Sequence, residues 1–202
     1  MERCAKIFST IRIAMVDRSE YNMKKIVVLN GSGRVGGNTS ALIDAFCKGA
    51  EEAGHEVVRF DLGKMTIHPC MGCFGGGKDA ASPCVQKDDM DKIYPVYREA
   101  DVVCFASPLY YWTISSLLKC ALDRLFAVVE CHDGDTQKPR EGVLLMAAEG
   151  YKYEACADWF DLMMARMQWT NRGKVLCGGV LNKGDITGNE KLKEAYALGK
   201  SL

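Results

Sequence analysis

Short apolar runs alternate with amphipathic stretches along most of the chain. The apolar runs are rich in Val, Leu and Ile, have the length of buried strands, and cover residues 26–30, 56–61, 102–107, 142–148 and 174–180. Apolar side chains recur at helical spacing around residues 42–50, 114–126, 156–167 and 189–200. A further helix is expected between Asp88 and Ala100, where Pro95 predicts either a kink or a single turn. This alternation predicts an α/β fold with a parallel sheet and helices on both faces.

The first 22 residues do not share this alternation. Lys6, Arg12 and Asp17 interrupt any apolar run there, and Met23 leads directly into the first predicted strand. Residues 1–22 are therefore either an extension upstream of a start at Met23 or an extra edge element of the sheet, and the sequence does not decide their order. We expect a single domain over residues 23–202, because no linker or repeat divides the rest.

Charge and cysteine usage narrow the class of protein. The 26 basic and 26 acidic side chains cancel, which argues against nucleic acid or an anionic membrane surface as a partner. No apolar run reaches the length of a membrane span, and the N-terminus carries no recognisable secretory signal. Half of the ten cysteines lie in apolar or amphipathic stretches as free thiols typical of a reducing, cytoplasmic setting: Cys47, Cys104, Cys120, Cys156 and Cys177.

The loop after the first strand, residues 31–40, is rich in glycine and hydrogen-bond donors. A P-loop is excluded, because Gly37 stands where that motif requires lysine. Gly31, Gly33 and Gly36 satisfy a dinucleotide fingerprint, with Asp61 at the end of the second strand, but this motif alone is weak. We favour a site for a phosphate monoester, because a helix N-terminus here is accompanied by Ser32, Arg34, Gly37, Asn38, Thr39 and Ser40. Two of these residues, Asn38 and Thr39, are also expected to cap the helix.

Aromatic residues gather in the loop after the third strand. Three adjacent rings there cannot all point into the core, so the loop either walls a flat aromatic ligand or packs at a subunit interface. The ligand-facing candidates are Pro108, Leu109, Tyr110, Tyr111 and Trp112. After the fourth strand, Glu149 and Gly150 offer a further wall.

Three cysteines follow the second strand with the spacing Cys-x2-Cys-x10-Cys, at Cys70, Cys73 and Cys84. A cubane iron–sulfur cluster normally takes four thiolates, so one is missing. His68 could complete the ligand set of a zinc site, giving one imidazole and three thiolates. A redox disulfide between Cys70 and Cys73 is another alternative. We rank plain loop thiols first, a metal site second and a redox pair third.

Together these motifs resemble the NADPH-dependent FMN reductase and iron–sulfur flavoprotein group of the flavodoxin-like superfamily, from Lys24 to the C-terminus. The matching segments are Gly31-Ser32-Gly33-Arg34-Val35-Gly36-Gly37-Asn38-Thr39, Cys70-Met71-Gly72-Cys73, Asp88-Asp89-Met90, Ala100-Asp101, Ser107-Pro108-Leu109-Tyr110, Leu118-Lys119 and Asp123-Arg124. One departure matters: where the cluster-bearing members carry a third early cysteine, this chain has Gly76 and its neighbours.

The resemblance implies a flavodoxin-like three-layer sandwich of strand order 2-1-3-4-5 that binds FMN without a covalent link. It would place the loop of residues 32–40 on the FMN phosphate and residues 108–112 along the isoalloxazine ring. The expected function is an NAD(P)H oxidoreductase that passes hydride through flavin N5 to a small acceptor such as a quinone, a flavin, or a nitro or azo compound. No catalytic side chain is nominated, an iron–sulfur cluster is not expected, and the group commonly forms homodimers or homotetramers. The alternatives are an electron-transfer protein, with or without a metal at the three cysteines, and a non-catalytic binding module.

Overall fold

A computed structural model describes residues 23–132 and 138–202, so the proposed N-terminal extension lies outside the described residues. Five strands form one parallel sheet in the order β2-β1-β3-β4-β5, as the resemblance implied. The strands are β1 (Lys25–Asn30), β2 (Glu56–Asp61), β3 (Val102–Pro108), β4 (Glu141–Ala147) and β5 (Thr170–Cys177). The chain adds β2 on one side of β1 and then β3, β4 and β5 on the other side, so the strand order reverses between β1 and β3. Ligands bind at this switch point in open α/β sheets.

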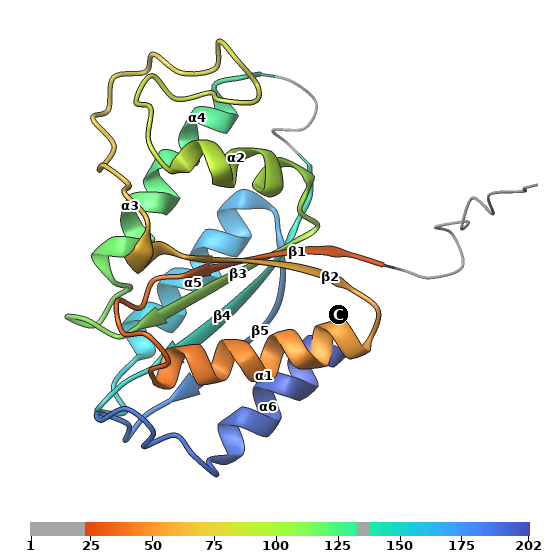
Figure 1. Cartoon of the computed structure of the whole chain (residues 1–202), viewed down its shortest axis with the longest axis vertical. Helices are drawn as coiled ribbons and strands as arrows, with labels where there is room; N and C mark the ends of the chain where they lie inside the picture. Colours follow the sequence, from red (N-terminus) through yellow and green to blue (C-terminus); the bar gives the residue numbers. More distant parts are fainter. Residues whose placement is uncertain (1–22, 133–137) are drawn as a thin grey trace, which may run out of the picture.

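Helices cover both faces of the sheet and bury two separate apolar layers (Figure 1). One face carries α1 (Asn38–Glu52) and α6 (Glu190–Lys200), and the other carries α2 (Met90–Glu99), α3 (Ser116–Arg124), α4 (Phe126–Val129) and α5 (Glu154–Met167). A 3₁₀ turn, η1 (Leu62–Lys64), follows β2. Strands β1, β3 and β4 are buried on both faces, which explains their continuous apolar runs. Within the described ranges, no helix is both long and apolar enough to cross a membrane.

The structure revises three of the predicted elements. Strand β5 begins four residues earlier than expected, at Thr170, and ends at Cys177, because its polar first half lies at the sheet edge and gives no apolar run. The helix with Pro95 runs for 10 residues, so the single-turn alternative is wrong. Pro95 faces solvent, and Ile93, Tyr94 and Tyr97 on the other side of the helix are buried. Because proline has no N–H to donate to the carbonyl four residues earlier, that carbonyl of Asp91 is left for water to bind. The stripe predicted over 114–126 is split between α3 and α4.

The five cysteines assigned to the core behave as small apolar side chains. Cys104, Cys156 and Cys177 are buried and Cys47 and Cys120 are half-buried, all as free thiols. Burial raises the pKa of Cys47 to about 12 and the pKa of Cys156 to about 11. The thiols of Cys47 and Cys156 therefore stay protonated at neutral pH, as expected for packing residues.

A buried ion pair holds the long segment between β2 and α2 against α3. The Arg124 guanidinium is fully buried and lies 2.7 Å from the Asp88 carboxylate, whose side chain is 2% exposed. Asp88 also accepts hydrogen bonds from the backbone N–H groups of His68 and Met90, each at 3.0 Å. Burial by itself would raise the pKa of Asp88, but the hydrogen bonds from Arg124 and from the two N–H groups lower it to about 2.

We expect Asp88→Asn to lower the free energy of unfolding by about 3 kcal/mol at pH 7, because it leaves the buried Arg124 charge unpaired. The pKa of Asp88 is lower in the folded than in the unfolded chain, so its ionisation stabilises the fold above about pH 4. That stabilisation, about 2 kcal/mol, is lost as the pH falls towards 2. Urea denaturation between pH 7 and pH 3 measures both effects.

Asp123→Asn is the control, because Asp123 is 42% exposed and pairs with Lys119 on the surface of α3. It should change stability by less than about 1 kcal/mol. An acid dependence in Asp88→Asn equal to that of the parent would contradict the assignment of this titration to Asp88.

Candidate functional site

The loops that follow β1 and β3 are bonded to each other at the switch point of the sheet. Ser115, the N-cap of α3, donates from its hydroxyl to the Gly31 carbonyl at 2.7 Å. The same hydroxyl accepts from the Leu118 N–H at 3.3 Å, and the Ser115 N–H donates to Ser107 Oγ at 2.8 Å. Both serines are buried. A single side chain therefore fixes the position of one loop relative to the other.

Gly31 is required by this close approach. A Cβ at residue 31 would lie 2.6 Å from Ser115 Oγ and 2.7 Å from Leu118 Cβ, both closer than real Cβ atoms come. The absence of a side chain is thus what lets the first loop rest on the start of α3. The glycine pattern in the sequence has a steric reason here that does not depend on a dinucleotide.

Helix α1 begins without a side-chain cap. Its N-cap is Gly37, so the prediction that Asn38 and Thr39 cap the helix is wrong. The Asn38 carboxamide instead donates to the Asn182 carbonyl at 2.9 Å and accepts from the N–H groups of Gly184 and Ile186. The first backbone N–H groups of α1 are left available to an anion, at the positive end of the helix dipole.

Two cations flank this helix terminus. Arg34 donates to the Leu181 carbonyl at 2.7 Å, which brings its guanidinium beside the loop after β5. Lys183 comes from that same loop, and its Nζ lies 3.3 Å from the position that a Cβ would take at Gly36. Sequence reasoning missed Lys183, because nothing in its own segment distinguishes it from a solvated surface lysine.

The other predicted phosphate contacts lie in or beside a cavity of about 360 Å³ at this loop. Ser32 Oγ accepts from the Arg34 N–H at 3.3 Å, and Ser40 Oγ accepts from Arg59 at 3.4 Å. Thr39 is buried at the first turn of α1 and is not part of the cavity lining. The hydroxyls of Ser32 and Ser40 can each still donate to a ligand oxygen.

Asp61 lines the same cavity but is already satisfied by three donors. Asn30 donates to it at 2.9 Å, Arg59 at 2.7 Å and Lys64 at 3.1 Å. Burial would raise the pKa of Asp61, but these hydrogen bonds lower it to about 2. A carboxylate that already accepts from three donors is a poor acceptor for the hydroxyl groups of a ribose, so the geometry disfavours the dinucleotide interpretation. Arg59, which also pairs with Asp44, is neutralised as well.

The aromatic loop after β3 is a strained two-residue hairpin. Tyr110 and Thr113 exchange two backbone hydrogen bonds of 3.0 Å, and the two residues between them, Tyr111 and Trp112, have φ values of 48° and 59°. This is the pattern of a type I′ turn, which strongly prefers Asn-Gly. A large side chain in the left-handed region costs about 1–2 kcal/mol. The turn holds both rings in water: Tyr111 is 93% exposed and Trp112 is 60% exposed.

The predicted ring-binding residues meet around a second cavity, of about 480 Å³. Its lining comes from the loops after β3 and β4 and comprises Leu109, Tyr111, Trp112, Ala148, Glu149, Gly150, Tyr151 and Lys152. Pro108 ends β3 beside this cavity and pairs with Ala147, while Tyr110 lies at the base of the hairpin. Lys152 adds a charge that sequence reasoning did not single out.

The cysteines of the described segment are not gathered around a common centre. In the part of the chain that the structure describes, no three His, Cys, Asp or Glu side chains are grouped to hold a metal ion. Cys84 Sγ instead accepts from the Arg124 Nε–H at 3.2 Å, and His68 Nδ1 lies 3.1 Å from Asp88. Cys84, His68 and the Cys70–Cys73 pair therefore do not converge on a common centre, so the described residues as arranged do not fit a zinc ion or an iron–sulfur cluster.

FMN fits this edge of the sheet. Its phosphate monoester matches an uncapped helix N-terminus between Arg34 and Lys183, and its flat ring matches a cavity walled by Tyr111 and Trp112. Fold and site together define a flavodoxin-like α/β protein with separate places for a phosphate and for an aromatic ring.

Comparison with known proteins gives the family. The sequence profile of the NADPH-dependent FMN reductase family matches residues 24–174. An iron–sulfur flavoprotein of Archaeoglobus fulgidus is 32% identical over 180 residues, which are 89% of this chain and 79% of that protein. An FMN-dependent NADPH-azoreductase of Staphylococcus saprophyticus is 33% identical over 103 residues, about half of each chain. The solved NAD(P)H:quinone oxidoreductase from Methanothermobacter marburgensis superposes with a TM-score of 0.65 at 18% identity, covering 89% of this chain and 96% of that one, which shows the shared fold.

The chain belongs to the NADPH-dependent FMN reductase family, with iron–sulfur flavoproteins among its relatives. It is accordingly an FMN-dependent NAD(P)H oxidoreductase.

Tyr111→Asn/Trp112→Gly should stabilise the apo protein, since it places the preferred residues at both left-handed positions. We expect the free energy of unfolding to rise by about 2 kcal/mol and Tm by about 5 °C. Differential scanning calorimetry of the apo protein measures the change. Tyr111→Phe/Trp112→Phe keeps the strain and should leave Tm unchanged; a drop in Tm for the Asn-Gly variant would show that the hairpin is not strained.

Proposed function

We propose that the loop after β1 and the loop after β5 together hold the FMN phosphate, and that the hairpin at Tyr111 and Trp112 holds the flavin ring. The observation that carries this proposal is the uncapped start of α1 between two cations from different loops. Bound FMN supplies the hydride chemistry, accepting electrons from NADPH and passing them to a second substrate.

The residues of the chain orient and enclose the cofactor. Backbone N–H groups of α1 and the hydroxyls of Ser32 and Ser40 donate to the phosphate. Arg34 supplies charge, and Asn38 positions Lys183 by binding the backbone around it, with one of its amide hydrogens left for the ligand. Thr39, at the first turn of α1, contributes its backbone N–H.

The ring site determines which acceptors can react. Tyr111 and Trp112 on one side and the segment Glu149–Lys152 on the other leave an open slot beside the flavin position. A flat, uncharged acceptor such as a quinone, a free flavin, or a nitro or azo compound can stack in this slot.

Exposed rings at such a slot also suit a second subunit, so we propose a homodimer or homotetramer. All the cysteines of the described residues are free thiols, which suits a reducing, cytoplasmic compartment.

Rapid mixing of the FMN-loaded protein with NADPH under anaerobic conditions tests the activity. We expect the visible flavin absorbance to bleach within seconds and to return when a quinone is added. A flavin that is bound but stays oxidised for minutes would instead support an electron carrier without nicotinamide activity. Protein that does not retain FMN on gel filtration would support the non-catalytic binding module.

Lys183→Gln should weaken FMN binding about tenfold, since one charge-assisted contact to the phosphate is lost. The affinity for riboflavin, which lacks the phosphate, should not change. Titration of apo protein with each flavin, followed by fluorescence quenching, measures both constants. Lys193→Gln is the control, because Lys193 lies on the exposed side of α6 and pairs with Glu190. Equal FMN affinity in Lys183→Gln and Lys193→Gln would remove Lys183 from the site.

A further inference from the structure

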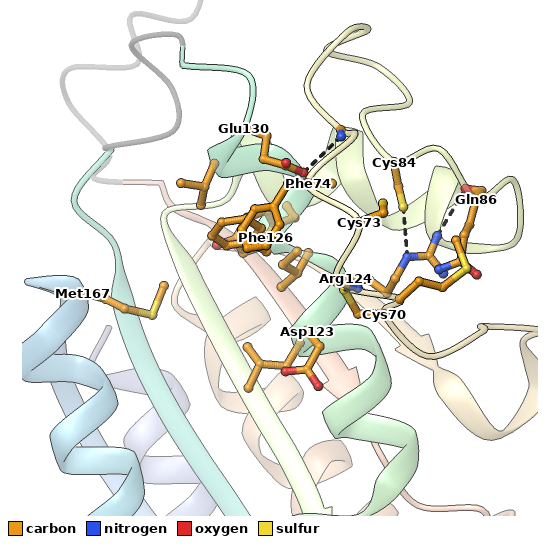
Figure 2. Close-up of a pocket in the computed structure, with 18 of the residues that line it drawn as sticks. Cys70, Cys73, Phe74, Cys84, Gln86, Asp123, Arg124, Phe126, Glu130 and Met167 are labelled. Atoms are coloured by element: carbon orange, nitrogen blue, oxygen red, sulfur yellow. Dashed lines mark hydrogen bonds between the residues drawn. The ribbon is translucent and has the colours of Figure 1, made fainter.

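A further cavity of the described chain lies away from the proposed flavin site, under the cysteine segment. It has a volume of about 620 Å³, within the range of small-molecule sites, and is bounded by residues 70–76, by α3 and α4, and by the end of α5. None of its lining residues belongs to the loops after β1, β3 or β4 that form the proposed FMN site. In Figure 2 the rings of Phe74 and Phe126 lie between Met167 on one side and the cysteines on the other.

The roof of this cavity is anchored at both ends. Arg124 uses all five of its N–H donors there: Nε binds Cys84, Nη1 binds the His68 carbonyl and Asp88, and Nη2 binds the Gln86 carbonyl and Asp88. At the other end Glu130 accepts from the Gly76 N–H at 3.2 Å. These contacts, drawn in part in Figure 2, make the space a built cavity and not a gap under a loose loop.

Apolar side chains face this space and remain open to water. Phe74 is 80% exposed, Met71 64% and Phe126 47%, and Met167 at the end of α5 is 38% exposed. The rings of Phe74 and Phe126 pack edge to face with centroids 5.9 Å apart. Phe74 also has a φ of 49°, which is costly for an aromatic residue. Strain combined with exposed apolar surface is typical of a binding site without its ligand.

The charges around the cavity define what it can accept. Arg124 is the one cation that lines it among residues 23–132 and 138–202, and it has no donor left for a ligand. The remaining charged lining groups are the carboxylates of Asp123 and Glu130. An anionic ligand would therefore be repelled without compensation, whereas an uncharged ring loses nothing.

We propose that this cavity is a second binding site, distinct from the flavin site, which takes an uncharged aromatic small molecule. Phe74 and Phe126 supply the aromatic contact, and the flexible thioethers of Met71 and Met167 adapt to the ligand. The site does not depend on a metal at Cys70, Cys73 or Cys84, and its occupancy is independent of electron transfer at FMN.

A matched pair of fluorescent probes tests the proposal on the FMN-loaded protein. N-phenylnaphthylamine is uncharged, and anilinonaphthalene sulfonate has the same rings with a sulfonate added. We expect saturable binding of the uncharged probe at one per chain and at least tenfold weaker binding of the sulfonate. Equal affinity for the two probes would overturn the charge argument, and no binding of either would overturn the site.

Variants locate the probe. Met167→Glu should weaken binding at least tenfold, whereas Leu162→Glu, the same change at a 57% exposed position of α5 outside the cavity, should not. Phe74→Asn removes one wall at a position where Asn tolerates positive φ, so it should reduce binding without loss of Tm. Probe binding that survives both cavity variants would place the probe elsewhere and refute the proposal. A dimer that Met167→Glu dissociates, together with no probe binding by the parent, would assign this face to contacts between copies of the chain instead.

Discussion

The hydroxyl of Ser115 is the contact on which the geometry of the proposed flavin site depends. It bonds the Gly31 carbonyl and starts α3, while its own N–H is held by Ser107, so the ends of β1 and β3 become one rigid edge. The phosphate loop and the aromatic hairpin lie on either side of this bond. Because the hydroxyl is buried and fully used, losing it would leave a carbonyl and an N–H unsatisfied and would uncouple the two halves of the site.

The two halves of the proposed site would bind by different physical means. The phosphate half offers groups that have no side-chain partner among the described residues, namely the N–H groups at the start of α1 and the ammonium of Lys183. The ring half relies on strain, since Tyr111 and Trp112 occupy backbone conformations that other residues adopt at lower cost. Stability is given up at that hairpin to hold two large rings in water, where a flat cofactor and its acceptor can stack against them.

The cysteine segment is held in place by contacts with protein side chains. Arg124 and Asp88 fix this segment through a buried ion pair with a complete set of hydrogen bonds, and Cys84 takes part as an acceptor from Arg124. The result is a stable roof over an apolar cavity that faces away from the flavin edge. Iron–sulfur flavoproteins are among the relatives of this chain, but the thiols in the described ranges are not grouped for a cluster.

The apolar runs of the sequence by themselves predicted a parallel α/β fold, and the resemblance of the loop motifs to the FMN reductase group supplied the strand order and the cofactor. Apolar runs and glycine-rich turns are local signals that the fold does not override. The sequence could not place Lys183, which lies in the loop between β5 and α6 and reaches the loop after β1 only in the folded chain. Nor could it foresee that Asn38 would bind the loop after β5 and not cap its own helix. Nor could it detect the strain at Tyr111 and Trp112, since backbone dihedral angles are set by the hydrogen bonds of the closed hairpin. Long-range contacts and buried charge pairing arise only when the chain is folded, and they decided how the predicted residues are used.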